Sequence, residues 1–175
     1  KLHYDMTTII SGNWKMNGSK AMIDQWFNDF LKYTKDFENS NNIQDKPLIL
    51  ICVPDIYIEY AINKANEYNN QTKYFKIYIG AEDVYYEENG AFTGNTSPLF
   101  LNEINCKYTL VGHSERRQYQ NENDNLISKK AISALSHNIT PLICVGEDLA
   151  VRESNKHLEV VGNQVLKSTE GVDLE

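Results

Sequence analysis

Residues 108–117, YTLVGHSERR, hold a complete junction between a strand and a helix. Four mainly apolar residues lead into Gly112 and His113, and polar side chains begin at Ser114. We predict a strand over residues 108–111 and a helical turn behind it, with Ser114 as its N-cap. Taken alone, His113 is more typical of a hydrogen-bonded loop residue than of a reactive group.

The same kind of short apolar run recurs along the chain. Each run is four to seven residues long, rich in β-branched or aromatic residues, and followed by a turn signal, so we predict strands. Nearly continuous apolarity, as in LILICV, suits a strand buried on both faces of a parallel sheet. The expected strands are residues 8–11 (TIIS), 48–53 (LILICV), 75–81 (FKIYIGA), 108–111 (YTLV) and 139–145 (ITPLICV).

Longer segments with helical spacing separate these runs. Ser19 is a candidate N-cap for the first, and Pro98 suits the first turn of the third. The expected helices are residues 19–37, 56–68, 97–105, 123–137 and 149–168. In each of them the apolar residues are spaced as one stripe, which predicts a buried face. The stripe of the last two helices consists of Leu126, Ile127, Ala131, Ala134 and Leu135, and of Leu158, Val161, Val165 and Leu166.

Five βα units in succession indicate an α/β protein with a parallel sheet. An open doubly wound sheet and a (β/α)8 barrel both fit this order, but a barrel normally needs about 250 residues. The pattern alone therefore favours an open five-stranded sheet. We expect residues 1–175 to form a single domain, with residues 1–5, ahead of Met6, as possible additions to it.

Composition excludes several classes of protein. The 175 residues carry a net charge of −7, which argues against a nucleic-acid partner but not against a small anionic substrate. No apolar run reaches the roughly 18 residues of a membrane span, so we expect no membrane partner. Cys52, Cys106 and Cys144 lack metal-site spacing and lie in or beside apolar runs, which predicts buried free thiols, no metal, and a reducing cytoplasm.

Two residues that follow predicted strands could act on an anionic carbonyl compound, namely Lys15 and His113. Ligands of parallel α/β proteins bind at the carboxyl ends of the strands. If residues 12–15 stay extended, Asn13 and Lys15 point to the same side. A turn asparagine and a solvated lysine are the simpler interpretation of that pair taken by itself.

His113 stands where a helix begins, and that position favours a neutral imidazole. Backbone N–H groups at a helix start disfavour nearby positive charge. A neutral imidazole can donate a hydrogen bond to a carbonyl oxygen on which negative charge develops.

Four motifs together resemble one known family. They are SGNWKMNG at 11–18, GAFTG at 90–94, YTLVGHSERR at 108–117 and PLICVGED at 141–148. In this order and at these spacings they resemble the triosephosphate isomerase family, over residues 6–175. The resemblance implies a TIM (β/α)8 barrel with about five βα units present, in place of the open sheet. It also implies interconversion of dihydroxyacetone phosphate and D-glyceraldehyde 3-phosphate through an enediol(ate), in cytoplasmic glycolysis and gluconeogenesis, without metal or cofactor.

The resemblance assigns roles residue by residue. Asn13 and Lys15 correspond to substrate-binding positions, with Lys15 also counted as catalytic, and His113 corresponds to the electrophile that works with a glutamate base. The loop from Gly90 to Gly94 corresponds to the homodimer contact. Supporting positions are Thr93 in that loop, Ser114 beside the histidine, Glu115 as the acidic neighbour of Lys15, Cys144 as a buried cysteine near the base, and Glu147 in an acid–base network behind the site.

Some residues depart from the family pattern. Glu82 and Asp83 stand where the family usually has an amide pair, and Asn95 replaces a glutamate, so we expect Arg116 to lose that partner. The family's motif with the glutamate base does not occur, and the sequence is expected to stop before that sixth strand.

Two other interpretations stay open at this stage. The chain could be a truncated, non-catalytic barrel fragment that acts as a binding or structural protein, with activity of the 175-residue chain alone in doubt. It could also be another phosphosugar isomerase on the same barrel.

Overall fold

The computed structural model describes residues 8–38 and 47–173, so the suggested additions at residues 1–5 lie outside the described residues. The chain divides into two compact units, one ending at Glu82 and the other beginning at Asp83. No helix in the described ranges is both long enough and apolar enough to span a membrane.

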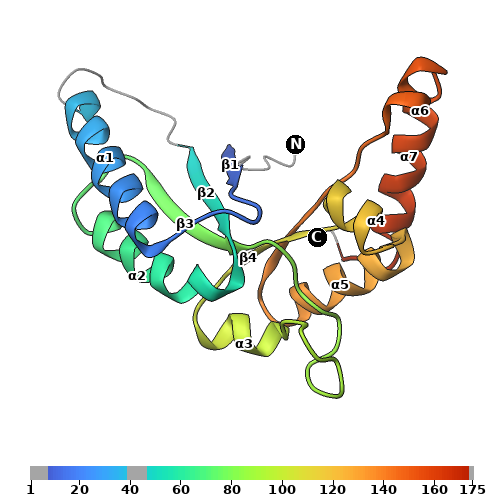
Figure 1. Ribbon diagram of the computed structural model, residues 1–175, viewed down its shortest axis with the longest axis horizontal. Helices are drawn as coiled ribbons and strands as arrows, with labels where there is room; N and C mark the ends of the chain where they lie inside the picture. The colour runs from blue at the N-terminus through green and yellow to red at the C-terminus, as the bar shows by residue number, and fades with distance from the viewer. Residues whose placement is uncertain (1–7, 39–46, 174–175) are drawn as a thin grey trace, which may run out of the picture. The chain divides into compact units, whose positions relative to one another are not determined.

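The first unit is a three-stranded parallel sheet covered by two helices. Strand β2 lies between β1 and β3 and pairs in parallel with both. Helices α1 and α2 lie side by side on one face of this sheet, and α2 packs on β3 (Figure 1). The elements are β1 (Ile9–Asn13), α1 (Lys20–Glu38), β2 (Leu48–Val53), the 3-10 helix η1 (Asp55–Tyr57), α2 (Ile58–Asn69) and β3 (Lys76–Ala81).

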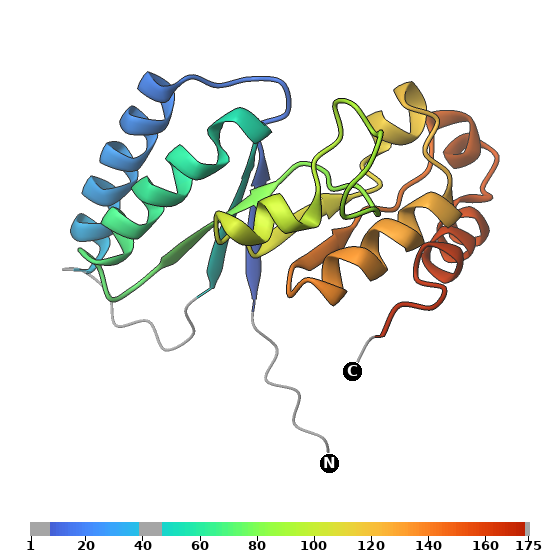
Figure 2. The same cartoon turned by 90° about the horizontal axis from the view of Figure 1, so that it is seen from below.

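The second unit contains two parallel strands, β4 and β5. Helix α5 packs on both strands, and α7 packs on α5 (Figure 2). The elements are α3 (Pro98–Glu103), β4 (Tyr108–Val111), α4 (Ser114–Tyr119), α5 (Asp124–Ser136), β5 (Thr140–Ile143), α6 (Leu149–Glu153) and α7 (His157–Ser168).

The expected strands all exist, and two have the expected bounds, β2 and β4. Strand β1 continues two residues beyond the predicted run, to Asn13, while β5 is shorter than predicted and ends at Ile143. The prediction that LILICV is buried is confirmed for its last four residues, since Leu50, Ile51, Cys52 and Val53 are at most 9% exposed.

Two predicted helix starts are confirmed by hydrogen bonds. The Ser19 hydroxyl oxygen accepts from the Met22 N–H at 3.0 Å, as an N-cap does. Pro98 is the first residue of α3, where its missing N–H costs nothing, and the Ser97 hydroxyl accepts from the Leu99 N–H at 3.1 Å.

The predicted helix over residues 149–168 is wrong in one respect, because it is two helices. Asn155 adopts a left-handed conformation with φ of 59°. Its N–H donates to the Arg152 carbonyl at 3.1 Å, and the Lys156 N–H donates to the Val151 carbonyl at 3.3 Å. This hydrogen-bond pair is a Schellman ending, which terminates α6 before α7 begins.

The apolar stripe of α7 is not buried among the described residues. Leu158 is 80% exposed and Leu166 is 72% exposed, whereas Ser168 is fully buried. The helix contacts α5 and α6, and these contacts leave the leucines uncovered.

The stripe predicted for α5 is also partly wrong. Leu135 is 36% exposed, while Lys130, which the pattern left out, is 1% exposed. A buried ammonium is tolerable only beside compensating charge. Lys130 meets that condition because its Nζ lies 2.8 Å from an Asp83 oxygen and also contacts Glu122.

Candidate active site

Asn13 and Lys15 of the first unit are joined by a tight turn. Strand β1 ends at Asn13, whose Oδ1 accepts a hydrogen bond from the Lys15 N–H at 2.8 Å. The backbone is therefore not extended through Lys15, and the condition for the expected same-side arrangement fails there. The turn instead fixes the backbone of the lysine relative to the asparagine side chain.

Lys15 has an unusual backbone for its residue type. Its φ is 54°, a left-handed value that costs an ordinary side chain about 1 kcal/mol or more. The other described non-glycine residues with positive φ are Asn105, Asn121, Asn138 and Asn155. Asparagine tolerates this conformation better than lysine does, so Lys15 is the least favourable residue type among these five described positions. Strain of this kind is concentrated at functional sites.

His113 caps helix α4 in the second unit. Its Nδ1 accepts a hydrogen bond from the Glu115 N–H at 3.3 Å, and its backbone is extended, with ψ of 144°. The prediction that Ser114 is the cap is therefore wrong, since Ser114 is the first helical residue. The reason is the extended backbone at His113, which starts the helix one residue earlier than the serine would.

This cap decides where the imidazole proton lies. A ring nitrogen that accepts a hydrogen bond carries no proton, so in neutral His113 the proton is on Nε2. A carboxylate oxygen of Glu115 lies 3.6 Å from the same Nδ1, farther than the backbone N–H. The side chain is 23% exposed, so Nε2 is the donor that His113 can offer to a ligand.

Gly112 makes the turn between β4 and His113. Its φ is 72°, and a Cβ at this position would lie 2.7 Å from Cδ1 of Ile127. Only glycine combines that conformation with that close approach. The packing of α5 on β4 thus fixes the backbone that leads into His113.

Arg117, which the sequence pattern did not single out, lies next to the histidine turn. Its guanidinium donates to the Gly112 carbonyl at 2.8 Å and to the Cys144 carbonyl at 2.9 Å. It also lies 2.6 Å from Asp124 and donates to the Ser168 hydroxyl at 3.2 Å. One planar side chain therefore joins the ends of β4 and β5 to the start of α5 and the end of α7. In the sequence, Arg117 is marked only by its place as the second arginine of the HSERR motif.

Arg116, which we expected to lose an acidic partner, pairs with two other carboxylates of this chain. Its Nη2 lies 2.9 Å from Asp83, one of the departures, and its Nε lies 2.8 Å from Glu122. Lys130 contacts the same two carboxylates. Burial raises the pKa of the Asp83 carboxyl, and this outweighs the opposing attraction of Lys130 and Arg116.

Cys144 is free but only half-buried, so the prediction of three buried thiols holds for Cys52 and Cys106 alone. It follows β5, whose residues are themselves half-exposed. Burial still raises the pKa of the Cys144 thiol, partly countered by Arg117.

The last two expected site residues lie apart from the histidine turn in sequence. Glu147 accepts a hydrogen bond from Arg152 of α6 at 3.0 Å, and its place in an acid–base network behind the site stays a prediction. Thr93 lies exposed at the tip of the loop between β3 and α3. Asn13 and Lys15 belong to the first unit, and the other site residues belong to the second.

Comparison with known sequences decides the family. The family profile described as triosephosphate isomerase matches residues 8–175. The chain belongs to this family. Its five strands and intervening helices are βα units of the TIM (β/α)8 barrel, which corrects the open sheet favoured by pattern alone.

Curated relatives carry the same name. The chain is 39% identical over 164 residues to a protein named triosephosphate isomerase from Thermoanaerobacter pseudethanolicus, and 38% identical over 164 residues to one from another Thermoanaerobacter strain. Each comparison covers 94% of this chain and 60% of the relative. The chain thus spans less than two thirds of the length of these relatives.

Proposed function

We propose that the protein is a triosephosphate isomerase, which interconverts dihydroxyacetone phosphate and D-glyceraldehyde 3-phosphate in glycolysis and gluconeogenesis. The proposal rests on the family and above all on the hydrogen bond between the Glu115 N–H and Nδ1 of His113. In a neutral ring that bond leaves Nε2–H as the donor, which is the group that the proposed reaction needs at the substrate carbonyl.

In the proposed reaction a carboxylate base removes a proton from the carbon next to the carbonyl. Negative charge moves to the carbonyl oxygen, where His113 donates its Nε2–H and stabilises the enediol(ate). The carbonyl oxygen takes the proton of Nε2, and Nε2 recovers a proton from the neighbouring hydroxyl group, so that the imidazole is restored. The base returns its proton to the former carbonyl carbon, which completes the isomerisation. Because charge develops on the oxygen during the reaction, the histidine contributes more to the transition state than to substrate binding. The base is not among the residues to which we assign a role.

Lys15 and Asn13 are the proposed substrate-binding pair. Lys15 is exposed and carries a compact charge that suits the substrate phosphate. Asn13 holds the lysine backbone through the 2.8 Å bond. We expect Lys15→Ala to raise KM and to lower kcat.

Ser114, Glu115, Cys144 and Glu147 are the proposed supporting residues. Ser114 and Glu115 form the first turn of the helix that His113 caps. The Cys144 carbonyl accepts from Arg117, which also binds the Gly112 carbonyl next to the histidine.

We further propose a single barrel domain, a cytoplasmic location and a homodimer formed through the loop from Gly90 to Gly94, with Thr93 at the contact. The exposure of the loop tip supports the proposed dimer. Residues 89–95 are all exposed, and the exposed fraction of Phe92 is 36%.

A coupled assay with both triose phosphates tests the function, with longer phosphosugars as a comparison panel. We expect turnover of the two trioses and none of the longer sugars. Turnover of a longer sugar alone would favour another phosphosugar isomerase, and no turnover by the folded whole protein would favour a binding or structural role.

A further inference from the structure

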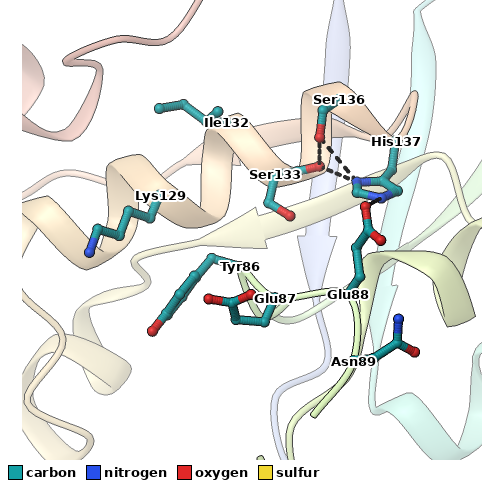
Figure 3. A pocket seen from close by; sticks show the side chains of 9 residues that line it. All are labelled: Tyr86, Glu87, Glu88, Asn89, Lys129, Ile132, Ser133, Ser136 and His137. Atoms are coloured by element: carbon teal, nitrogen blue, oxygen red, sulfur yellow. Dashed lines mark hydrogen bonds and ion pairs between the residues drawn. The ribbon is translucent and has the colours of Figure 1, made fainter.

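The second unit contains a hollow of about 580 Å³ between the loop that follows β3 and helix α5. Glu88 reaches from the loop to His137 at the end of the helix (Figure 3). The proposed isomerase chemistry uses neither residue.

Both ring nitrogens of His137 face hydrogen-bond acceptors. Nδ1 lies 2.7 Å from the Ser133 carbonyl oxygen, and Nε2 lies 3.0 Å from a Glu88 carboxylate oxygen. The Ser136 hydroxyl donates to the Ser133 carbonyl at 2.8 Å, so it turns a lone pair toward Nδ1 at 3.1 Å. A neutral imidazole has one proton and satisfies one of these sites, whereas an imidazolium donates from both nitrogens.

The end of α5 also favours a cation at this position. His137 is the C-cap of this 13-residue helix, the end of a helix that carries partial negative charge. The imidazole is only 13% exposed, so nearby charges are weakly screened, while Glu88 is 58% exposed. The other titratable groups of the hollow are Tyr86, Glu87 and Lys129 (Figure 3). Lys129 Nζ lies 5.5 Å from the centre of the Tyr86 ring.

Glu88 stands at the base of an exposed loop tip. Its carbonyl oxygen accepts from the Ser97 hydroxyl at 2.7 Å, and Ser97 caps helix α3. The Tyr85 N–H donates to the Thr96 carbonyl at 2.8 Å and closes the two sides of the loop. Residues 89–95 lie beyond these bonds and are exposed. Glu88 therefore connects the tip to α3 through its backbone and to α5 through its side chain.

We propose that Glu88 and protonated His137 form a proton-dependent latch that positions the loop tip, residues 89–95. With both ring nitrogens protonated, the ion pair holds the base of the loop to α5. A neutral ring that keeps its proton on Nδ1, toward the Ser133 carbonyl oxygen at 2.7 Å, presents a lone pair to the Glu88 carboxylate, and the attraction is lost. The latch uses no residue of the proposed catalytic site, and the loop tip that it positions is the one that we also propose as the homodimer contact.

Amide hydrogen exchange of residues 85–97 tests the latch, at pH 5.5 and pH 8.5 with correction for intrinsic exchange rates. We expect protection in the wild-type protein to fall by about three-fold between the two pH values, the change that loss of a part-exposed ion pair predicts. Glu88→Gln and His137→Gln should show the lower protection at both pH values. Glu87→Gln removes a neighbouring charge without touching His137 and should behave like the wild type.

Nitrogen NMR of the imidazole supplies a second readout that a merely structural role would not change. At pH 5.5 the wild type should show both His137 nitrogens protonated, and Glu88→Gln should shift that population toward the neutral ring. Wild-type protection that does not vary with pH, or an equal variation in Glu88→Gln, would overturn the proposal.

Discussion

Arg117 donates a hydrogen bond to the carbonyl oxygen of Cys144 at 2.9 Å, although the two residues are 27 positions apart in the sequence. The same guanidinium holds the Gly112 carbonyl, directly before His113. The start of the histidine turn and the end of the fifth strand are thus held at fixed separation by one planar group. The stability of this region should depend on the shape of the arginine and not on its charge alone.

Arg117→Lys keeps the charge and removes the fork of donors, so it tests that dependence. We expect the free energy of unfolding to fall by about 2 kcal/mol, because two part-buried carbonyl oxygens lose their donors. Arg152→Lys is the matched control, since the Arg152 side chain is 61% exposed and its ion pair is with Glu147. It should change stability by less than about 0.5 kcal/mol. Denaturant unfolding gives both values, and equal effects would contradict the role of Arg117.

Gly112→Ala should lower the free energy of unfolding by about 2–4 kcal/mol, because it combines a left-handed backbone with overlap onto Ile127. Adding Ile127→Val removes the overlapping Cδ1 and should recover part of the loss, but not the backbone part. Gly146→Ala is the control, since a Cβ there meets nothing within 4 Å. A double variant no more stable than Gly112→Ala would argue against the overlap.

Asp83 gives a pH dependence of defined sign. Its pKa is raised in the folded state by burial, so the folded protein binds the proton more tightly than the unfolded chain does. The stability of the wild type relative to Asp83→Asn should therefore be highest below the pKa of the unfolded chain, about 3.9, and decline as pH rises through the folded pKa. Unfolding curves for both proteins across the acidic range measure this difference. A stability difference that rises with pH would mean that the attraction of Arg116 and Lys130 for the carboxylate outweighs the effect of burial.

Lys15→Gly should stabilise the protein by about 0.5–1 kcal/mol, since glycine adopts a positive φ without strain. It should also abolish the proposed substrate binding, so stability and activity would change in opposite directions. Asn138→Gly, at a φ of 58° that asparagine already tolerates, should gain much less stability. Thermal melts and the isomerase assay test the pair, and a destabilised Lys15→Gly would contradict strain at this lysine.

The fold follows from local patterns wherever burial and residue type agree. LILICV is apolar throughout and is a central strand, and Ser19 caps α1 as its position predicts. The break at Asn155 was missed because asparagine at a helix end is a weaker signal than glycine. Asn105 and Asn138 end α3 and α5 with the same pair of hydrogen bonds. In this chain an asparagine directly after a predicted helix therefore indicates where that helix ends.

The site was predictable only in part. Motifs identify single residues and the family, but they do not show which residues from distant segments come into contact. His113 and Lys15 stand out as residues behind strands, and their motifs point to the family. Helix periodicity could not find Lys130, because a buried lysine looks like a break in the apolar stripe. Its partners, Asp83 and Glu122, come from other segments and are brought to it only by folding.

The kinetics of His113→Gln test the central claim most directly, with His157→Gln as the control at a histidine outside the proposed site. Steady-state assays of the whole protein, with circular dichroism to verify folding, give kcat and KM for each variant. The account predicts that His113→Gln lowers kcat by about 100-fold or more with little change in KM, and that His157→Gln behaves like the wild type. A folded His113→Gln protein with unchanged kcat would contradict it.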